Sequence, residues 1–370
     1  MTAVFYITGH GFGHAVRQFA IVNALADLRP DVRIVLRTPV APWLVARNVR
    51  TGVRLEPVQV DTGAIQRGSL DVDVPATLAA AQAFYAGAVS WLDAEVAFLR
   101  HEDVRLVVAD IPPLPFAAAR HAGVPAIGIS NFTWDWIYED YDARRLAPGL
   151  VETIGDLYGL AGEAWRLPMH GGFATMPRRR DLPLVARVAR APRDIVRRAL
   201  GLPADQPLVL VSLGGFGAGG VDLAAAAASM RGLADVVVTS YDAAPSVDGL
   251  HRVDETRLYD QGLRYEDLVG AVEIVASKPG YGIISECAAN ATALLYTDRG
   301  RFCEYDVLVR EMPRYLESAF LSQDDLRAGR WRRTVSDLLI RPPRPAAPAE
   351  GAVTAARWLS ERLDEPRSQR

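Results

Sequence analysis

The stretch VFYITGHGFGHAVRQFAIVNAL, residues 4–25, contains the pattern that decides the fold. It opens with a short apolar run, continues through three alternate glycines, Gly9, Gly11 and Gly13, and ends in a helix-like pattern. A strand, a tight glycine turn and a helix in this order are typical of a parallel α/β sheet. Two histidines in the turn, His10 and His14, distinguish it from an ordinary phosphate-binding turn.

The alternation of strands and helices continues through the first half of the chain. Short β-branched runs stand at residues 4–8, 32–38, 53–60, 105–110 and 125–130. Helical patterns separate them, at residues 15–28, 41–48, 76–100 and 114–122. Because these runs are apolar on both faces, they predict a parallel sheet covered by helices on both sides.

The same alternation of strand and helix patterns resumes in the second half of the chain. Strand patterns stand at residues 207–215, 235–240, 273–278 and 293–297, and helical patterns at 222–232, 281–291, 303–318 and 325–340. We therefore predict an α/β protein of two doubly wound, Rossmann-like domains that face each other across a cleft. The expected domains are residues 1–180 and 181–345. A proline-rich spacer then leads to residues 346–370, expected to form a helix that packs back on the first domain.

The composition excludes several classes of protein. The net charge is −3, with basic and acidic residues interspersed, so the signature of a nucleic-acid binder is absent. No run approaches the roughly 20 apolar residues that a membrane span needs. Cys287 and Cys303 match no metal or redox spacing, and we expect two reduced thiols in a cytoplasmic protein, with a disulfide between them as the alternative.

The opening turn fits a catalytic loop better than a dinucleotide cradle. His14 stands where that fingerprint needs its third glycine, and the second strand ends in Arg37-Thr38 instead of an acidic residue. A histidine in the first turn of a helix suits a general base. Asp110, at the tip of the fourth strand, would orient it. The alternatives are that both histidines cap and pack, and that Asp110 caps the following helix.

Two glycine-rich turns of the second half can bind an anion through backbone amides. In SLGGFGAGG, residues 212–220, the candidates are Ser212, Gly214 and Gly215. The candidates in the second turn and its helix are Lys278, Gly280, Tyr281, Gly282, Ser285 and Glu286. The last two suit a ribose contact. A turn without ligand and a solvated Glu286 are the alternatives.

Residues 71–75, DVDVP, imitate a D-x-D metal site. A second cluster of ligands is missing, so the sequence predicts no metal.

The combination of motifs resembles the GT-B glycosyltransferases. The stretches that carry the likeness are GHGFGHAVR (9–17), VVADIPPLPFAAARHAGVPAIGISNFTWDWIY (107–138), YEDLVGAVEIVASKPGYGIISE (265–286) and FCEYDVLVREM (302–312). They are most similar to the nucleotide-sugar-dependent branch, with MurG and the UDP-glycosyltransferases, and to the glycosyltransferase-like N-terminal domain of L-arabinokinases.

This resemblance implies a nucleotide-sugar donor in the C-terminal domain and an acceptor in the N-terminal domain. Glu304 matches the acidic position that reads donor-sugar hydroxyls, His14 the general base and Asp110 its acidic partner. Tyr305 replaces the common glutamine, and KPGY at 278–281 replaces H-G-G or R-S-G, which leaves the donor sugar undefined.

The candidate acceptor-binding residues are His10, Arg17, Gln66, Asn131, Trp134 and Trp136. The last three belong to an aromatic-rich stretch, residues 131–141, that could stack on an acceptor ring. Packing in the core is the alternative for these aromatic side chains.

The sequence thus predicts an inverting, metal-independent glycosyltransferase that moves a sugar from a nucleoside diphosphate to a small-molecule acceptor. It needs no cofactor beyond this co-substrate, and a homodimer is compatible with the pattern. The alternatives are a nucleotide-sugar epimerase or hydrolase of the same fold and a non-catalytic sugar-nucleotide-binding module.

Overall fold

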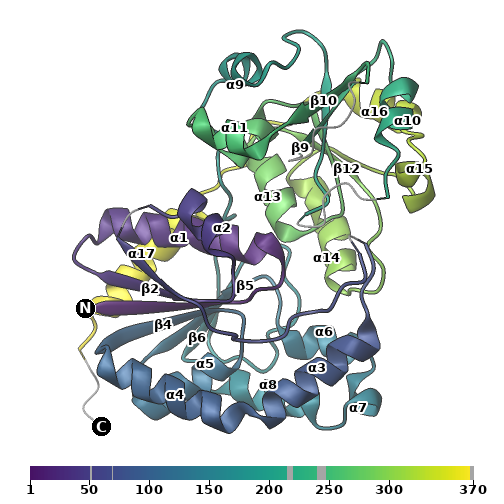
Figure 1. The fold of residues 1–370 in the computed structure, drawn as a ribbon. Coiled ribbons are helices and arrows are strands. Elements are labelled where there is room, and N and C mark those ends of the chain that lie inside the picture. Colours follow the sequence, from purple (N-terminus) through teal and green to yellow (C-terminus); the bar gives the residue numbers. More distant parts are fainter. Residues whose placement is uncertain (51, 69, 215–219, 240–246, 367–370) are drawn as a thin grey trace.

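Two parallel β-sheets form the two lobes of the molecule (Figure 1). The structure, a computed structural model, describes residues 1–50, 52–68, 70–214, 220–239 and 247–366. The first sheet has seven strands in the order β3-β2-β1-β4-β5-β6-β7, and the second has six in the order β10-β9-β8-β11-β12-β13. The predicted α/β class, with two doubly wound sheets, is confirmed.

The strands of the first sheet are β1 (Thr2–Ile7), β2 (Arg33–Arg37), β3 (Val53–Glu56), β4 (Val104–Asp110), β5 (Ala126–Ser130), β6 (Glu163–Arg166) and β7 (Arg179–Asp181). Those of the second are β8 (Leu208–Val211), β9 (Asp235–Thr239), β10 (Leu250–Val253), β11 (Ile274–Ser277), β12 (Ala293–Tyr296) and β13 (Ser318–Phe320). The central strands are buried on both faces, as their continuous apolar sequences predict.

The helices of the first lobe are α1 (Gly11–Leu28), α2 (Pro42–Asn48), α3 (Val74–Ala86), α4 (Ala88–His101), α5 (Leu114–Ala122), α6 (Trp134–Asp140), α7 (Ala143–Leu146) and α8 (Leu150–Gly159). Those that follow are α9 (Arg193–Leu200), α10 (Leu223–Ser229), α11 (Glu255–Asp260), α12 (Tyr265–Gly270), α13 (Tyr281–Ala289), α14 (Glu304–Glu311), the short 3-10 helix η1 (Met312–Arg314), α15 (Gln323–Arg327), α16 (Arg332–Leu339) and α17 (Gly351–Asp364).

Several expected elements differ in detail. The single helix expected over residues 76–100 is two helices, because Gly87 ends α3 and starts α4. The strand expected over residues 53–60 ends at Glu56, and the chain continues as a loop toward the other lobe. The helix expected over residues 303–318 stops at Glu311, just before Pro313, which cannot continue an α-helix.

The topology brings the decisive loops together. In the first sheet β1 and β4 are neighbours although a long crossover separates them, and Ile7 pairs with Asp110 at their carboxyl ends. The amide of Thr8 donates to the carbonyl of Asp110 at 2.8 Å. In the second sheet β8 and β11 are neighbours in the same way, and the amide of Ser212 donates to the carbonyl of Ala276 at 2.9 Å. Such switch points are where open α/β sheets bind ligands.

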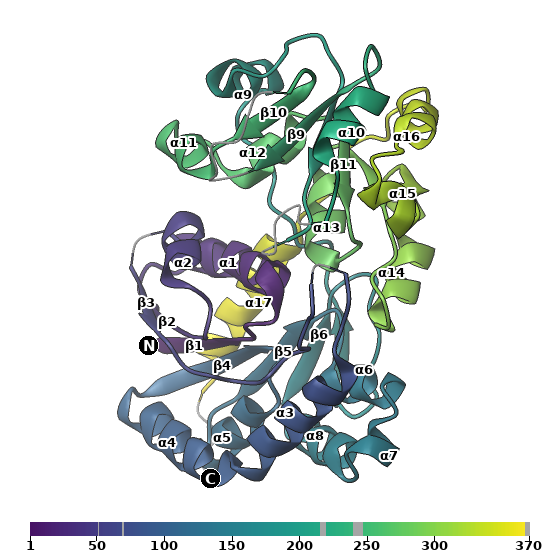
Figure 2. The ribbon, with the colours of Figure 1, turned by 45° about the vertical axis from the view of Figure 1, so that its right-hand side comes forward.

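One continuous apolar core joins the two lobes. It fills the face of the first sheet under α1, α2 and α17 and the face of the second sheet under α9, α12 and α13. Figure 2 shows α17 lying along the first lobe, beside α1. There Trp358 packs edge-on against Trp165 of β6, with ring centroids 5.3 Å apart.

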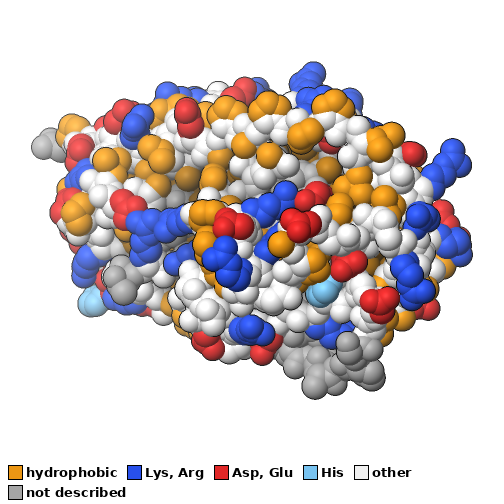
Figure 3. Space-filling view, turned by 90° about the horizontal axis from the view of Figure 1, so that it is seen from above, with side chains coloured by type: hydrophobic (Ala, Val, Ile, Leu, Met, Phe, Trp, Pro, Cys, Tyr) orange, Lys and Arg blue, Asp and Glu red, His pale blue; other side chains and the backbone are white. Residues whose placement is uncertain are grey.

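The surface seen from above the second lobe carries basic and acidic side chains in alternation (Figure 3). On this face the charged side chains do not gather by sign.

The segment between β7 and α9 ties both lobes together through Arg187. Its guanidinium pairs with Glu286 of α13 at 2.5 Å and with Glu266 of α12 at 3.1 Å. It also donates to the side-chain oxygen of Asn48 at 2.7 Å, across the gap to α2. Burial raises the pKa of Glu286, Glu266 raises it further, and Arg187 opposes both effects. Arg187 therefore allows two buried carboxylates to stand side by side.

We expect Arg187→Met to lower the free energy of unfolding by about 3–5 kcal/mol, because it leaves two buried carboxylates without their cation. Urea unfolding at pH 8 measures this loss, and Arg190→Met, at an exposed position of the same segment, serves as the matched control. The loss should shrink at pH 5, where protonation of Glu286 relieves the buried charge. An equal loss at both pH values, or an equal loss in the control, would contradict this account.

Candidate functional site

A cleft of about 730 Å³ lies between the carboxyl ends of the two sheets. The turn after β1 and the loop after β3 form its N-terminal wall, and the turns after β8, β11 and β12 form the opposite wall. The predicted site residues that line it are His10, His14, Arg17, Gln66, Ser212, Gly214, Lys278, Gly280, Tyr281, Gly282, Glu286 and Glu304.

The remaining predicted residues lie behind these walls. Asp110, Asn131, Trp134 and Ser285 are buried. Trp136 is half-buried, and Gly215 lies outside the described residues. The Ser285 hydroxyl donates to the carbonyl of Gly282 at 2.9 Å, a bond within the first turns of α13.

His14 stands in the first turn of α1 and meets the end of β4. Its Nδ1 lies 2.8 Å from Oδ1 of Asp110. Nη2 of Arg17 also lies 2.7 Å from Nδ1. In the tautomer with its proton on Nδ1, His14 donates to the carboxylate, and the lone pair of Nε2 is left for a substrate. Nε2 has no hydrogen-bond partner within the described part of the chain. Asp110 does not cap the next helix, because α5 begins at Leu114 with Pro113 at its N-cap position.

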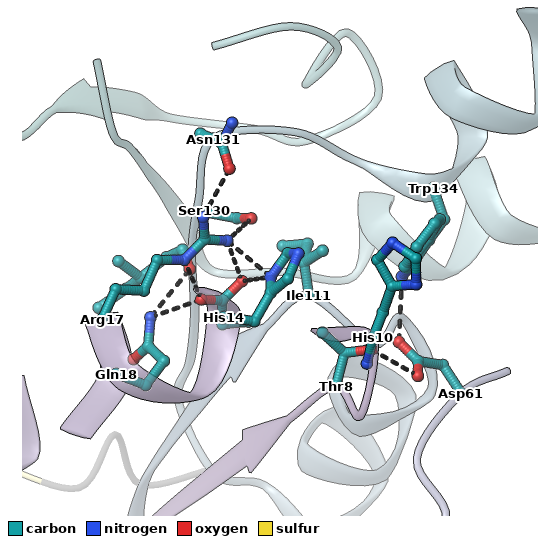
Figure 4. Close-up of polar contacts among 12 residues, drawn as sticks. Thr8, His10, His14, Arg17, Gln18, Asp61, Ile111, Ser130, Asn131 and Trp134 are labelled. Atoms are coloured by element: carbon teal, nitrogen blue, oxygen red, sulfur yellow. Dashed lines mark hydrogen bonds and ion pairs between the residues drawn. The ribbon is translucent and has the colours of Figure 1, made fainter. Parts of the chain in front are cut away.

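Arg17 holds the carboxylate in place through its guanidinium group, whose contacts are drawn as dashed lines in Figure 4. Its Nε and one terminal nitrogen donate to the two oxygens of Asp110, both at 2.6 Å. The guanidinium also donates to Asn131 at 2.6 Å and to Ser130 at 2.8 Å. Arg17 lines the cleft, where it stays a predicted acceptor contact, and its donors also fix the position of Asp110.

The network keeps His14 neutral. Burial lowers the pKa of His14 below its ordinary 6.5, and the nearby Arg17 lowers it further, while Asp110 acts in the opposite direction. Burial alone would raise the pKa of Asp110, but Arg17 and His14 hold it well below its ordinary range. The result is an uncharged imidazole beside a permanently ionised carboxylate, the protonation state that a general base needs.

The opposite wall presents backbone amides and a cation. Helix α13 begins at Tyr281, and its N-cap residue Gly280 provides no side-chain cap, so the first amides of the helix remain available to an anion. Lys278 lies in the turn before it. Burial lowers the pKa of Lys278 to about 8, and Arg299 contributes to the shift. Behind the turn, the Tyr265 hydroxyl donates to Oγ of Ser212 at 2.6 Å.

Two glycines allow the two lobes to touch at this point. A Cβ atom on Gly282 would lie 3.1 Å from Cα of Gly13, so the backbones of α13 and α1 are in close contact. Both helices begin here, and the positive ends of both dipoles point toward the same part of the cleft. Gly13 in the opening motif therefore provides the contact between lobes.

Glu304 bridges the lobes through both carboxylate oxygens. Oε1 accepts from Nδ2 of Asn131 at 2.8 Å, and Oε2 accepts from Arg299 at 3.1 Å. Asn131 thereby connects Arg17 on one side with Glu304 on the other. The expected acceptor residue Asn131 and the expected donor residue Glu304 thus belong to one continuous network between the two lobes.

The aromatic cluster packs mainly with itself. Trp134 is fully buried, stacks on Tyr138 at 5.4 Å and donates from its indole nitrogen to Asp61 at 3.0 Å. The ring of Trp136 presses on Gly171, where a Cβ atom would lie 2.2 Å from it. Core packing, the alternative reading of these aromatics, describes what the structure shows for both side chains.

The sequence analysis missed Asp61 and Arg299. Asp61 lines the cleft, accepts from Thr8 at 2.7 Å and has a pKa raised to about 6 by burial. Asp61 directly follows residues 53–60, the run that predicts a strand, and a charged residue after a predicted strand end was its signal. Arg299 follows β12 by three residues and could have been found in the same way, as a charged residue after a strand end.

No group of three or more potential metal-ligating side chains occurs among the described residues. Asp73, one of the two aspartates of the D-x-D-like stretch at residues 71–75, caps α3 by accepting a hydrogen bond from the amide of Ala76. Both cysteines, Cys287 and Cys303, are free thiols. Within the described ranges, no helix has the length and apolar character needed to cross a membrane.

The chain matches no family model, but it is similar to curated proteins. It is 28% identical over 369 residues to the L-arabinokinase of Arabidopsis thaliana, covering 96% of this chain and 34% of that protein. It is 26% identical over 186 residues to a UDP-N-acetylglucosamine–N-acetylmuramyl-(pentapeptide) pyrophosphoryl-undecaprenol N-acetylglucosamine transferase of Clavibacter michiganensis, covering 49% of this chain and 47% of that enzyme. The chain thus spans from a third to a half of the length of these relatives.

Solved structures match along nearly the whole chain. The glycotransferase of kitacinnamycin superposes with a TM-score of 0.66 at 14% identity, covering 98% of this chain and 99% of that one. UGT2 of Phytolacca americana, complexed with UDP-2fluoro-glucose and pterostilbene, superposes with a TM-score of 0.61 at 12% identity. The match covers 98% of this chain and 94% of that one. Two lobes that face each other across the carboxyl ends of their sheets, in a chain similar to glycosyltransferases in sequence and in structure, establish that this protein has the GT-B glycosyltransferase fold.

Proposed function

We propose that this chain transfers a glycosyl group from a nucleoside-diphosphate sugar to a hydroxyl group of a small molecule. One observation carries the proposal: a neutral His14, oriented by Asp110, shares a single cleft with the open amides of α13 and with Lys278. The first group suits the activation of an acceptor, and the second group suits the binding of a diphosphate. Transfer between the two requires both in one cavity.

In this scheme Nε2 of His14 takes the proton from the acceptor hydroxyl. The acceptor oxygen then attacks the anomeric carbon, and the bond between that carbon and the diphosphate oxygen breaks. Attack from the side opposite to the leaving group inverts the configuration at the anomeric carbon. Asp110 stabilises the imidazolium that forms, and Arg17 keeps Asp110 ionised and in place.

The leaving nucleoside diphosphate carries the negative charge that develops in the transition state. The amides at the starts of α13 and α1 and the ammonium of Lys278 are the groups proposed to stabilise it, without a metal ion. Glu286 would contact the ribose while it also pairs with Arg187, and Glu304 would contact hydroxyls of the donor sugar. EDTA should leave the rate unchanged if this assignment is right.

The relatives support the donor class. One carries UDP-N-acetylglucosamine in its name as an N-acetylglucosamine transferase, and one solved neighbour is complexed with UDP-2fluoro-glucose and pterostilbene. The free thiols Cys287 and Cys303 fit the reducing cytoplasm, where we place the reaction.

The first experiment pairs binding with turnover. A thermal-shift panel of UDP-, GDP-, ADP- and dTDP-sugars should identify a stabilising donor, and release of the nucleoside diphosphate is then measured with acceptors. His14→Gln should lower kcat by roughly 10²–10⁴-fold, since the general base is lost, and leave the donor-induced shift unchanged. His121→Gln, at an exposed position, is the matched control. Donor consumption without an acceptor at the full rate would indicate a hydrolase or epimerase, and the absence of any shift would contradict the proposal.

The pH dependence of kcat/KM provides a second test. Because burial and Arg17 lower the pKa of His14, the free base predominates at neutral pH. The rate should therefore be flat through neutrality and fall on the acidic side with a midpoint below 6.5. A midpoint above 7 would contradict the assignment of His14 as the base.

Donor affinity should depend on Lys278 at alkaline pH. Its pKa of about 8 means that the ammonium loses its proton above that pH, whereas both phosphates of a nucleotide sugar stay ionised. Calorimetric titration with the stabilising donor should show affinity falling above pH 8. Lys278→Arg should abolish this fall. Lys278→Met should weaken binding roughly ten- to a hundredfold below pH 8, the loss of a charged hydrogen bond, and the difference from the wild type should shrink above that pH. Parallel pH curves for all three proteins would contradict this role.

A further inference from the structure

His10 occupies a defined place in the cleft that the transfer scheme leaves unused. Its ring stacks on Phe302 of the second lobe, with centroids 6.0 Å apart, and meets the edge of Trp134 at 5.2 Å. The ring centroid of His14 lies 6.2 Å away. His10 occupies the N-cap position of α1 but makes no side-chain cap. The two aromatic rings hold the imidazole in place next to the base, and Figure 4 shows it beside Trp134.

A backbone contact fixes the tautomer of this ring. The amide of Ala64 donates to Nδ1 of His10 at 3.2 Å, so in the neutral ring the proton resides on Nε2. The loop can approach this closely because residue 63 is glycine. Gly63 has a φ of +60°, and a Cβ atom there would lie 2.8 Å from Cβ of His10. Nε2 itself has no hydrogen-bond partner among the described residues.

The surroundings keep His10 uncharged. Burial lowers its pKa well below 6.5, and His14, Arg299 and Lys278 all act in the same direction. Asp61 is the nearby carboxylate on the same wall, but its two oxygens accept from Thr8 and Trp134 instead of from His10. His10 is therefore a neutral hydrogen-bond donor at physiological pH.

Part of the wall that carries both histidines is polar, beside the aromatic rings that hold His10. Gln59, Asp61 and Gln66, from the loop after β3, line the cleft on the same lobe as both histidines. Two imidazoles this close can contact two oxygens of one small molecule, one as acceptor of a proton and the other as donor of a hydrogen bond. A single isolated hydroxyl would leave the second imidazole without a partner.

We propose that Nε2–H of His10 binds the oxygen next to the hydroxyl that His14 deprotonates, so that the acceptor is a polyhydroxylated molecule, such as a sugar, a sugar acid or a cyclitol. This inference rests on the proposed glycosyl transfer and adds its acceptor class. His10 is then a specificity-determining residue: it recognises the neighbouring oxygen and leaves the proton transfer to His14.

The first test needs no donor. Long-range ¹H–¹⁵N spectra of the histidine rings are assigned with the His10→Phe variant. They should show His10 as the Nε2–H tautomer from pH 5.5 to 8, a range that spans the ordinary histidine pKa of about 6.5. Addition of myo-inositol or D-glucose should shift its Nε2 resonance. A protonated ring at pH 6, the Nδ1–H tautomer, or no shift with either probe would overturn the proposal.

The second test uses turnover with the donor found by thermal shift. D-Glucose, D-glucuronate and myo-inositol are compared with their singly deoxygenated analogues and with 4-methoxyphenol. The deoxygenated analogue that lacks the contacted oxygen should lose about tenfold in kcat/KM, the worth of one hydrogen bond. His10→Phe, which keeps a ring between Phe302 and Trp134, should lower kcat/KM for the polyol to the value of the deoxygenated analogue. His10→Gln, which keeps an N–H, should restore part of this kcat/KM.

Other outcomes separate this inference from the proposed function. If no nucleotide sugar binds, the transfer itself fails, whereas the spectra still test the ring of His10. Turnover of 4-methoxyphenol alone, or of no acceptor in the panel, would overturn the acceptor class while the donor result stands. If His10→Phe lowers kcat/KM equally for the polyol and for its deoxygenated analogue, His10 has a structural role. If the variant shows a weaker thermal shift with the donor, His10 acts on the donor side. Either result would overturn its role in acceptor recognition.

Discussion

The buried carboxylate of Asp110 is the interaction on which the arrangement of the cleft depends. It receives hydrogen bonds from Arg17, Gln18 and His14, which come from one helix, while it ends a strand that lies two crossovers later in the chain. An ionised carboxylate in the interior is tolerated only when it is paired and fully hydrogen-bonded. Its position therefore fixes how α1 lies on the sheet, and with it where His14 points.

The same network extends across the two lobes. Arg17 contacts Asn131, Asn131 contacts Glu304, and Glu304 contacts Arg299 in the turn beside α13. A second connection runs through Arg187 between α2 and α13, and a third is the contact of Gly13 with Gly282. These polar links surround the cleft while a shared apolar core joins the lobes behind it. These contacts fix how the two lobes lie beside the cleft, and Arg17, Arg187 and Glu304 also line it.

Much of this architecture was readable in the sequence because it depends on local patterns. Apolar runs separated by helical stretches predict parallel sheets, and polar or glycine-rich residues directly after a strand predict the loops at the ligand-binding edge. His14, Asp110, Lys278 and the start of α13 follow this rule. Asp61 was missed because the strand before it ends four residues early, and the loop that carries it folds back over the cleft.

The sequence alone determined the class of fold, the position of the glycine turns and the pairing of a histidine with an acidic residue, because these depend on periodicity and on the order of strands. Only the tertiary structure decided the role of each polar group. Arg17 and Asn131 hold Asp110 and Glu304 in place, and Trp134 lies in the core. Whether a side chain faces a cleft or a neighbour depends on contacts between residues far apart in the chain, from 73 positions for Trp134 and Asp61 to 173 for Asn131 and Glu304, which no local pattern encodes.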